Sequence, residues 1–348
     1  MVRRGRRVKE GEKGFSTAPG DRLVGVGVLD VDKPVFRPGM LKSREIKLLK
    51  PPPLRRGQKI GVVAPAGSVT EQQLRLGVDA LVQAGFKVEL SEAIRERKGY
   101  LAGDKEKRAR ALGDFFRRDD IAAILCARGG FGSIQLLPLL DPEAIRLRPK
   151  IFVGYSDVSV LINWLRQKCG LVAFHGPMVA TDMSRGLEGR SKDFFWGTLL
   201  GEKRQWQLPL GETIRPGRVE AEMTGGCLSA IVTTLGTPFE IETSGKILFL
   251  EDIGERPYRI ERMLTHLQMA GKLDRIAGLA LGRFSDCEGD GERGVGELIR
   301  EFFGDAPYPV VTGLAAGHRG ENLLLPFGVR MALDGDAKIL SLLDSPVS

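Results

Sequence analysis

The sequence predicts an α/β protein whose first domain is built on a mostly parallel sheet. Short apolar runs typical of buried strands alternate with runs of helical periodicity, and small-residue turns follow several of the strand-like runs directly. At 348 residues the chain is also longer than a single hydrophobic core usually supports. A second domain is therefore expected.

The first half of the chain supplies this alternation. Strands are predicted over 60–68, including a closing small-residue turn, over 86–90 and over 121–127, and amphipathic helices over 71–84 and 105–116. In an open parallel sheet the crossovers are right-handed, and ligands bind beyond the carboxyl ends of the strands. The turns that directly follow strands are therefore candidates for a functional site.

One such turn lies in the run from Lys150 to Ser159. An apolar strand over 151–153 leads through a Gly-x-Ser turn into a helix, which places Ser156 at the junction. A hydroxyl held there points outward, and the N-terminus of the helix favours developing negative charge. The pattern predicts a nucleophile at Ser156. The alternative is that Ser156 or Asp157 only caps the helix.

A second turn, Arg128-Gly129-Gly130-Phe131-Gly132-Ser133, follows the strand at 121–127 and precedes a short predicted helix over 134–140. Both turns should lie at the same edge of the sheet. Glycines would let backbone N–H groups approach a reacting oxygen, as an oxyanion hole requires. A phosphate cradle is the rival interpretation, although neither the dinucleotide fingerprint nor the Walker spacing is present. A third is a tight turn without further role.

The second half of the chain shows a different pattern of composition and predicted elements. A polar segment with scattered aromatic residues, 181–218, is expected to connect the two domains. Beyond it, strands are predicted over 246–250, 276–281 and 309–314 and a helix over 258–269. The second domain is therefore expected to be α+β or a small barrel-like sheet.

Three side chains of this half can carry chemistry. Glu251 and Asp252 follow an apolar strand, where a carboxylate must find a partner or be desolvated at a cost. His318 lies in a polar loop after the strand at 309–314. Helix capping by either carboxylate and a solvated histidine are the alternatives. The order Ser156, Glu251, His318 matches one type of catalytic triad and would place the site between the domains.

The charge distribution argues against a nucleic-acid-binding body. Residues 1–56 carry 15 Lys/Arg and 6 Asp/Glu, which leaves 37 and 38 in the remainder of the chain. The segment 1–50 is expected to be a disordered basic leader that makes a poor signal peptide. No run is long enough for a membrane span, and the four cysteines lack metal or redox spacing. A cytoplasmic protein with reduced thiols is expected.

From about residue 51 to 341 the chain resembles the LD-carboxypeptidase family, which comprises the muramoyltetrapeptide carboxypeptidases and their microcin C self-immunity relatives. The matching motifs occur in the family's order over most of the chain. They are Val62-Val63-Ala64-Pro65-Ala66, Arg128-Gly129-Gly130-Phe131-Gly132, Gly154-Tyr155-Ser156-Asp157, Phe174-His175-Gly176-Pro177-Met178, Phe249-Leu250-Glu251-Asp252-Ile253-Gly254-Glu255 with Pro257-Tyr258-Arg259, and Gly317-His318 with Asn322 and Pro326.

The resemblance implies a Ser156 nucleophile, a Glu251 acid and a His318 base. Together with the turn chemistry it implies that the N–H groups of Gly130 and Asp157 hold the oxyanion while D-alanine leaves and water resolves an acyl-enzyme. No metal or cofactor is needed, and a homodimer is expected. The substrate is either a murein tetrapeptide or a peptidyl-nucleotide, and a non-enzymatic module that binds cell-wall peptides is the competing class.

The implied fold joins a flavodoxin-like or amidotransferase-like N-terminal domain, placed at 51–180, to a swivelling β/α C-terminal domain, placed at 219–345. The connection between them is placed at 181–218. The chain departs from the family's usual Gly-Gly-Asn-Leu at Gly225-Gly226-Cys227-Leu228, which removes an amide that could donate and accept hydrogen bonds.

Overall fold

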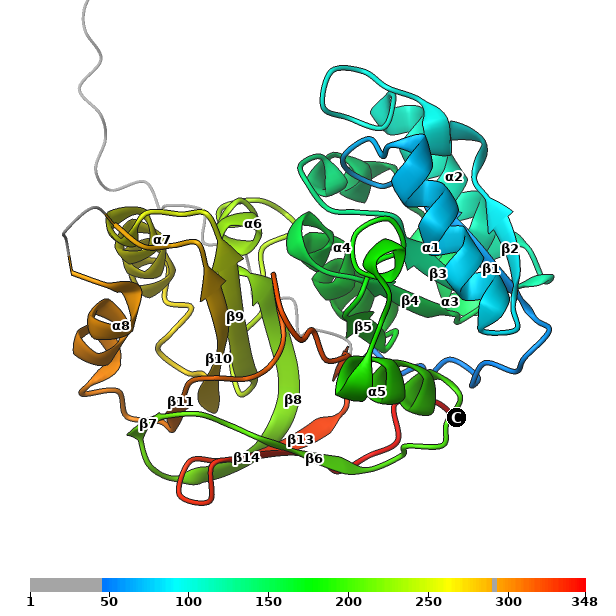
Figure 1. The fold of residues 1–348 in the computed structure, drawn as a ribbon. Helices are drawn as coiled ribbons and strands as arrows, with labels where there is room; N and C mark the ends of the chain where they lie inside the picture. The colour runs from blue at the N-terminus through cyan, green and yellow to red at the C-terminus, as the bar shows by residue number, and fades with distance from the viewer. Residues whose placement is uncertain (1–45, 290–292) are drawn as a thin grey trace, which may run out of the picture. The chain divides into compact units, whose positions relative to one another are not determined.

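The computed structural model describes residues 46–289 and 293–348, so nearly all of the expected basic leader lies outside the described residues. The described chain contains two sheets and helices from both halves of the sequence (Figure 1). The predicted α/β class with a mostly parallel first sheet and a second domain is confirmed. The domain boundaries proposed from the sequence stay a prediction.

The first sheet has six strands in the order β12-β5-β4-β3-β1-β2. Their bounds are β1 Lys59–Val63, β2 Lys87–Leu90, β3 Ile121–Cys126, β4 Ile151–Gly154, β5 Ala173–His175 and β12 Leu325–Phe327. The five strands from the first half pair in parallel, and only β12 runs antiparallel, along β5. The chain therefore returns from its second half to complete the first sheet.

Helices of the first half cover this sheet. Their bounds are α1 Glu71–Gln83, α2 Lys105–Arg117, α3 Pro142–Leu147 and α4 Ser159–Trp164. The side chain of Thr70 accepts a hydrogen bond from the Gln73 N–H, which begins α1 at the predicted place. The short helix predicted over 134–140 is a 3₁₀ helix, Ser133–Leu139, which includes Pro138.

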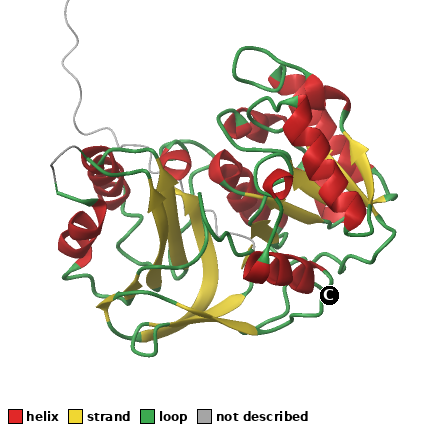
Figure 2. Cartoon of the chain, viewed as in Figure 1, coloured by secondary structure: helices red, strands yellow, loops and turns green. Residues whose placement is uncertain are grey.

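The second sheet has eight strands in the order β6-β14-β13-β8-β9-β10-β11-β7. Their bounds are β6 Trp206–Pro209, β7 Thr213–Arg215, β8 Arg218–Cys227, β9 Ile247–Ile253, β10 Gly278–Ser285, β11 Val310–Val311, β13 Arg330–Asp334 and β14 Ile339–Leu342. The long strand β8 curves through the sheet (Figure 2). Its first half pairs antiparallel with β13 and its second half pairs parallel with β9. The second sheet is thus mixed, and only residues 210–212 separate its two edge strands, β6 and β7.

Three further helices accompany this sheet, α6 Leu228–Val232, α7 Pro257–Met269 and α8 Val295–Phe303. The buried face of α7, formed by Ile260, Leu264 and Leu267, packs with β9 and β10 in one hydrophobic cluster. Each of these side chains contributes roughly 1.5–3 kcal/mol through burial. Figure 1 shows α7 and α8 beside β9 and β10.

The segment 181–218, expected to be a connection, is more ordered than its polar composition suggests. It contains α5 Gly189–Leu199 and the strands β6 and β7. The aromatic residues scattered through it are anchors: the Trp196 ring stacks on Phe86, with the ring centroids 4.9 Å apart. Both strands belong to the second sheet.

Three strand predictions of the second half need correction in their boundaries. The strand predicted over 276–281 is Gly278–Ser285. The strand predicted over 246–250 continues to Ile253, so Glu251 and Asp252 lie within β9 and not after it. The strand predicted over 309–314 is only Val310–Val311.

In the described chain, none of the helices has the length and apolar character needed to cross a membrane. The four cysteines are buried, and none of them forms a disulfide bond.

Candidate active site

Ser156 lies just beyond the carboxyl end of β4, where the chain turns into a 3₁₀ helix over Ser156–Val158 and then into α4. Its φ of 62° is unusual for a residue other than glycine. Such strain costs on the order of 1–3 kcal/mol and persists where the surroundings impose it. The geometry is that of a nucleophile elbow.

Neither Ser156 nor Asp157 acts as the helix cap that the sequence left open. The Asp157 carboxylate instead accepts a hydrogen bond from the Ser133 N–H at 2.8 Å. In the described chain Ser156 has no side-chain bond to the first turn of its own helix. The serine hydroxyl is therefore available for other chemistry.

The glycine turn after β3 lies directly against Ser156. A Cβ placed on Gly129 would lie 2.7 Å from Ser156 Cβ and 2.8 Å from its Oγ, so only glycine fits there. Gly130 follows with φ of +118°, and within the described chain its N–H has no hydrogen-bond partner. The two turns are neighbours, as their positions after adjacent parallel strands predict.

Glu251 and His318 form a hydrogen-bonded pair. His318 Nδ1 lies 2.7 Å from Glu251 Oε2, and the His318 backbone N–H donates to the same oxygen at 3.1 Å. In the neutral tautomer of His318 whose Nδ1–H donates to this oxygen, Nε2 keeps its lone pair. Glu251 is fully buried, and a Cβ on Gly317 would lie 2.5 Å from its Oε2. The loop therefore needs glycine beside the histidine.

His318 meets the serine turn through Tyr155. The Tyr155 and His318 rings lie edge to face with their centroids 4.9 Å apart. Within the described residues no hydrogen bond joins Ser156 to His318. Catalytic hydrogen bonds are often long without bound substrate, so this does not exclude them from acting together.

Contacts between α4 and β8 hold the serine turn against the second sheet. The Asn163 side chain of α4 donates to Gly225 O and accepts from Thr224 Oγ1, both at 2.7 Å. One turn earlier, Ser159 Oγ accepts from the Cys227 N–H at 3.1 Å. Cys227 pairs in register with Glu251 of β9. The helix behind Ser156 is thus linked through β8 to the strand that carries the acid.

The surroundings tune both histidines of this region. Burial lowers the pKa of His318, but the hydrogen bond and charge of Glu251, helped by Asp252 and Asp182, outweigh it and raise that pKa above its usual value. His175 of β5 packs against Tyr155 and is fully buried. Burial and the nearby His318 lower the pKa of His175 to about 3. His175 is therefore neutral at physiological pH.

Asp252, the second of the paired carboxylates, points to a different partner. Its oxygens accept from the Ser229 N–H at 2.7 Å and from Ser229 Oγ at 3.0 Å, at the start of α6. The alternative that Asp252 caps the next helix, α7, is therefore wrong, because this carboxylate bonds to the first turn of α6. Glu251 caps no helix in the described chain.

Cys227, at the position where the sequence departs from the family pattern, is buried beside both carboxylates. Its Sγ lies 3.3 Å from Ser229 Oγ and 3.5 Å from Asp252 Oδ1. Burial, with the charges of Glu251 and Asp252, raises the pKa of this thiol well above its ordinary value. The neutral thiol fills space next to the acid.

A cavity of about 530 Å³ opens beside Tyr155. Residues from three separated segments line it: Tyr155, 182–191 and 319–322. An ion pair between Arg190 and Glu321 joins two of these segments. Arg185 also lines the cavity, and within the described residues its guanidinium has no hydrogen-bond or ion-pair partner. Local sequence pattern marks neither Asp182 nor Arg185, because their positions beside Tyr155 depend on contacts between distant segments.

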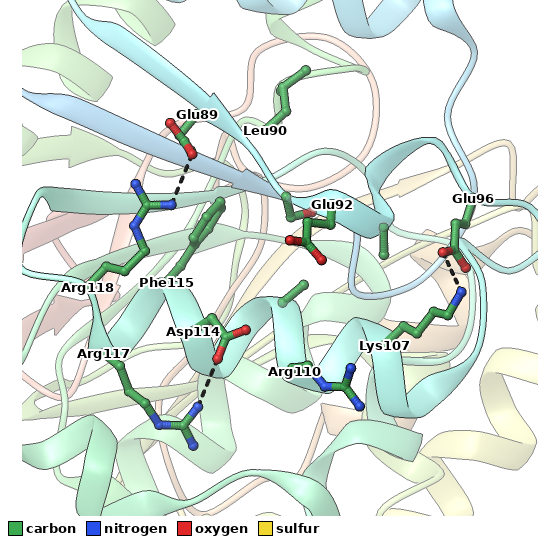
Figure 3. A pocket seen from close by; sticks show the side chains of 13 residues that line it. Glu89, Leu90, Glu92, Glu96, Lys107, Arg110, Asp114, Phe115, Arg117 and Arg118 are labelled. Atoms are coloured by element: carbon green, nitrogen blue, oxygen red, sulfur yellow. Dashed lines mark hydrogen bonds and ion pairs between the residues drawn. The ribbon is translucent and has the colours of Figure 1, made fainter.

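A second hollow, of about 550 Å³, lies between β2 and α2 and contains none of these residues (Figure 3). Its side chains pair with one another: Glu89 with Arg118, Glu96 with Lys107, and Asp114 with Arg117. No group of His, Cys, Asp and Glu suited to a metal ion occurs in residues 46–289 and 293–348.

Comparison with known proteins assigns the family. The N-terminal domain model of the LD-carboxypeptidases matches residues 60–176, and the C-terminal domain model matches residues 220–333. A probable murein peptide carboxypeptidase of Bacillus subtilis is 38% identical over 295 residues, covering 82% of this chain and 91% of that protein. The microcin C7 self-immunity protein MccF of Escherichia coli is 28% identical over 331 residues, covering 85% and 96%.

A solved structure agrees. The crystal structure of muramoyltetrapeptide carboxypeptidase from Oxalobacter formigenes superposes with a TM-score of 0.77 at 31% identity, covering 83% of this chain and 100% of that one. The N-terminal domain model extends over Ser156, and the C-terminal domain model extends over Glu251 and His318. The chain belongs to the LD-carboxypeptidase family, whose members are serine-type peptidases.

Proposed function

We propose that this protein is an LD-carboxypeptidase that releases the terminal D-alanine from murein-derived tetrapeptides. Ser156 is the nucleophile, His318 the general base and Glu251 the acid that orients it. The observation that carries the proposal is the buried Glu251–His318 hydrogen bond, which engages Nδ1 and leaves Nε2 free to act as a base when the ring is neutral, with the His318 ring packed against Tyr155 beside Ser156.

In this mechanism His318 Nε2 takes the Ser156 proton as Oγ attacks the carbonyl of the residue before D-alanine. The N–H groups of Gly130 and Asp157 donate to the resulting oxyanion. His318 then gives the proton to the leaving nitrogen, and D-alanine departs. Water, deprotonated by His318, attacks the Ser156 ester and restores the hydroxyl.

The cavity beside Tyr155 is the place for the peptide in this proposal. Its uncommitted guanidinium, Arg185, supplies a partner for a substrate carboxylate, and an exopeptidase must recognise a chain that ends in one. Arginine suits this task because its fork binds a carboxylate through two parallel hydrogen bonds.

The direct experiment measures D-alanine released by purified protein from L-Ala-γ-D-Glu-meso-diaminopimelate-D-Ala, with Ser156→Ala as the control. We expect release by the wild type and none above background by the variant. An equal rate from both proteins would overturn the serine mechanism.

The similarity to MccF motivates a second candidate, a peptidyl-nucleotide amidase that acts in self-immunity. An aminoacyl sulfamoyl adenosine, the class of compound present in a solved MccF complex, is the substrate to compare. Faster cleavage of that compound than of the tetrapeptide would favour the amidase. Binding of the tetrapeptide with no turnover of either compound would favour a non-enzymatic binding module.

The cytoplasmic location, expected from the character of the segment 1–50, and the homodimeric state, expected from the family resemblance, belong to the same proposal. Light scattering on the purified chain should give twice the mass of 38.1 kDa. A mass of one chain across the working concentration range would contradict the dimer.

A further inference from the structure

A buried arginine, Arg108, bonds to three backbone carbonyls near the carboxyl ends of the strands of the first sheet. Arg108 of α2 is 2% exposed, yet it forms no ion pair within the described residues. Its guanidinium donates to the carbonyl of Gly132 at 3.0 Å, to that of Gly103 at 3.2 Å and also to that of Pro65. Burying a cation without a directly bonded carboxylate is unfavourable. The burial of this cation therefore indicates a structural role for Arg108.

The positions of these carbonyls in the fold indicate that role. Pro65 lies just after β1, and Gly132 ends the glycine turn that contacts Ser156. A Cβ on Gly132 would lie 2.8 Å from the Arg108 guanidinium, so arginine and glycine fit each other. Arg108 therefore fixes the glycine turn relative to the neighbouring strand.

The side chain of Asp157 fixes the same turn from the other side. Asp157 is 7% exposed, and its carboxylate accepts from the Ser133 N–H, one residue beyond Gly132. Burial raises the pKa of this carboxyl, while the Ser133 and Gly132 N–H groups and the charge of Arg108 oppose that rise. The residue that follows the nucleophile is thereby tied to the turn that carries Gly130.

We propose that Arg108 and the Asp157 carboxylate are positioning residues that set the separation between the Gly130 and Asp157 N–H groups. The inference rests on the proposed function, in which these two N–H groups hold the oxyanion. One N–H comes from each turn, and the Asp157–Ser133 bond joins the turns directly. Neither side chain exchanges a proton with the substrate.

The expected signature is loss of transition-state binding with ground-state binding retained. Asp157→Ala removes the bond to Ser133 and should lower kcat about a hundredfold, because misplacing one donor by about 1 Å has an effect of that order. KM should change less than about threefold. Asp157→Asn keeps an oxygen that can accept from Ser133 and should restore kcat to within about tenfold of the wild type.

A second measurement uses a peptidyl phosphonate, which forms a covalent adduct on serine and places an anionic oxygen at the oxyanion position. Its rate of reaction with Asp157→Ala should fall in parallel with kcat. The affinity of an uncleavable peptide amide, measured by calorimetry, should stay within about threefold. Arg108→Gln should lower kcat and the rate of reaction with the phosphonate, as Asp157→Ala does.

Lys150 provides a matched control. It is a buried cation, 6% exposed, that donates to the carbonyls of Arg118 and Ile121, both at 2.7 Å. It directly precedes β4, at the end of the strand away from Ser156. Lys150→Gln should lower the melting temperature as the Arg108 variant does while keeping kcat within about twofold.

The outcomes separate the two proposals. If Ser156→Ala remains active, the proposed function fails. If activity requires Ser156 but Asp157→Ala keeps normal kcat, the positioning role is wrong. Equal losses of kcat in folded Asp157→Ala and Lys150→Gln proteins would also overturn it, because general destabilisation would then be the cause. A rise in KM without a fall in kcat would point to substrate binding and would contradict it as well.

Discussion

The hollow between β2 and α2 and the cavity beside Tyr155 have similar volumes, about 550 and 530 Å³, but different construction. One continuous stretch, 89–118, lines the hollow, whereas three segments from both halves of the chain line the cavity. Each region has an exposed arginine without an ion pair among the described residues, Arg110 in the hollow and Arg185 in the cavity. The difference lies in what surrounds them.

In the hollow, six of the other charged side chains form three ion pairs at or near the surface (Figure 3). Pairs of this kind contribute about 0–1 kcal/mol and are screened by salt. In the cavity, Tyr155 connects the wall to His318 and to the strained serine turn. Size and charge alone therefore do not identify a site; convergence of distant segments on a reactive group does.

The largest expected effect is the loss of the reactive group itself. Ser156→Ala, His318→Ala and Glu251→Gln should each lower kcat by several orders of magnitude, and combining them should add little because the three side chains act as a unit. Steady-state kinetics with the tetrapeptide measures this. Additive losses in the double variants would mean that the three residues act independently.

A smaller effect distinguishes the two neighbouring carboxylates. Asp252→Asn should keep kcat within about tenfold of the wild type, because Asp252 bonds to α6 and not to His318. If Asp252→Asn abolished turnover while Glu251→Gln did not, the acid would have been assigned to the wrong residue.

The pH profile of the Asp252→Asn variant gives a further test. A general base must be neutral, so kcat/KM should fall as the pH drops through the raised pKa of His318. Asp252 helps to raise that pKa, and removing its charge should move the midpoint of the acid limb to lower pH. A shift of this midpoint to higher pH would contradict the proposal that the charge of Asp252 raises the pKa of His318.

The two unpaired arginines test the comparison directly. Arg185→Gln should raise KM roughly tenfold, the equivalent of about 1.4 kcal/mol, by removing one charged hydrogen-bonding partner of the substrate. Arg110→Gln in the hollow is the matched control and should change KM less than about twofold. Similar changes in both variants would mean that charge acts at long range and that the cavity is not special.

The smallest effect is expected at the N-terminal end. Deleting residues 1–44 should leave the melting temperature and kcat nearly unchanged, because this basic sequence offers no apolar face to bury. Extending the deletion through Leu49 should lower the melting temperature, since Leu49 exchanges backbone hydrogen bonds with Gly170 and Val172. A large loss from the shorter deletion would show that the leader packs against the body.

Local patterns in the sequence were sufficient for the strands β1 to β4 and the helices α1, α2 and α4, whereas α3 and β5 were not predicted. The elbow at Ser156 and the glycine turn at 128–132 carry short-range signals, since a strand, small residues and a helix follow one another. Their contact follows from the parallel order of β3 and β4, which the fold class already implies. Glu251 and His318 needed the family resemblance as well.

Other features depend on pairings that local pattern does not encode. Strand β12 joins the first sheet by pairing with β5, Leu325 opposite His175, across some 150 residues of sequence. Arg108 looks like any cation on an amphipathic helix until the fold places Pro65 and Gly132 around it. Glu251 appeared to follow a strand because charge usually marks a strand end, whereas here the strand continues and buries the acid.

In the proposed mechanism Ser156 forms a covalent bond with its substrate while His318 acts as its base. Mass spectrometry of the protein after treatment with a peptidyl phosphonate tests it most directly. We predict one adduct per chain, located on the peptide that contains Ser156, absent in Ser156→Ala and formed far more slowly in His318→Ala. Stoichiometric D-alanine release by wild-type protein with no adduct on Ser156, or an adduct on another residue, would contradict the account.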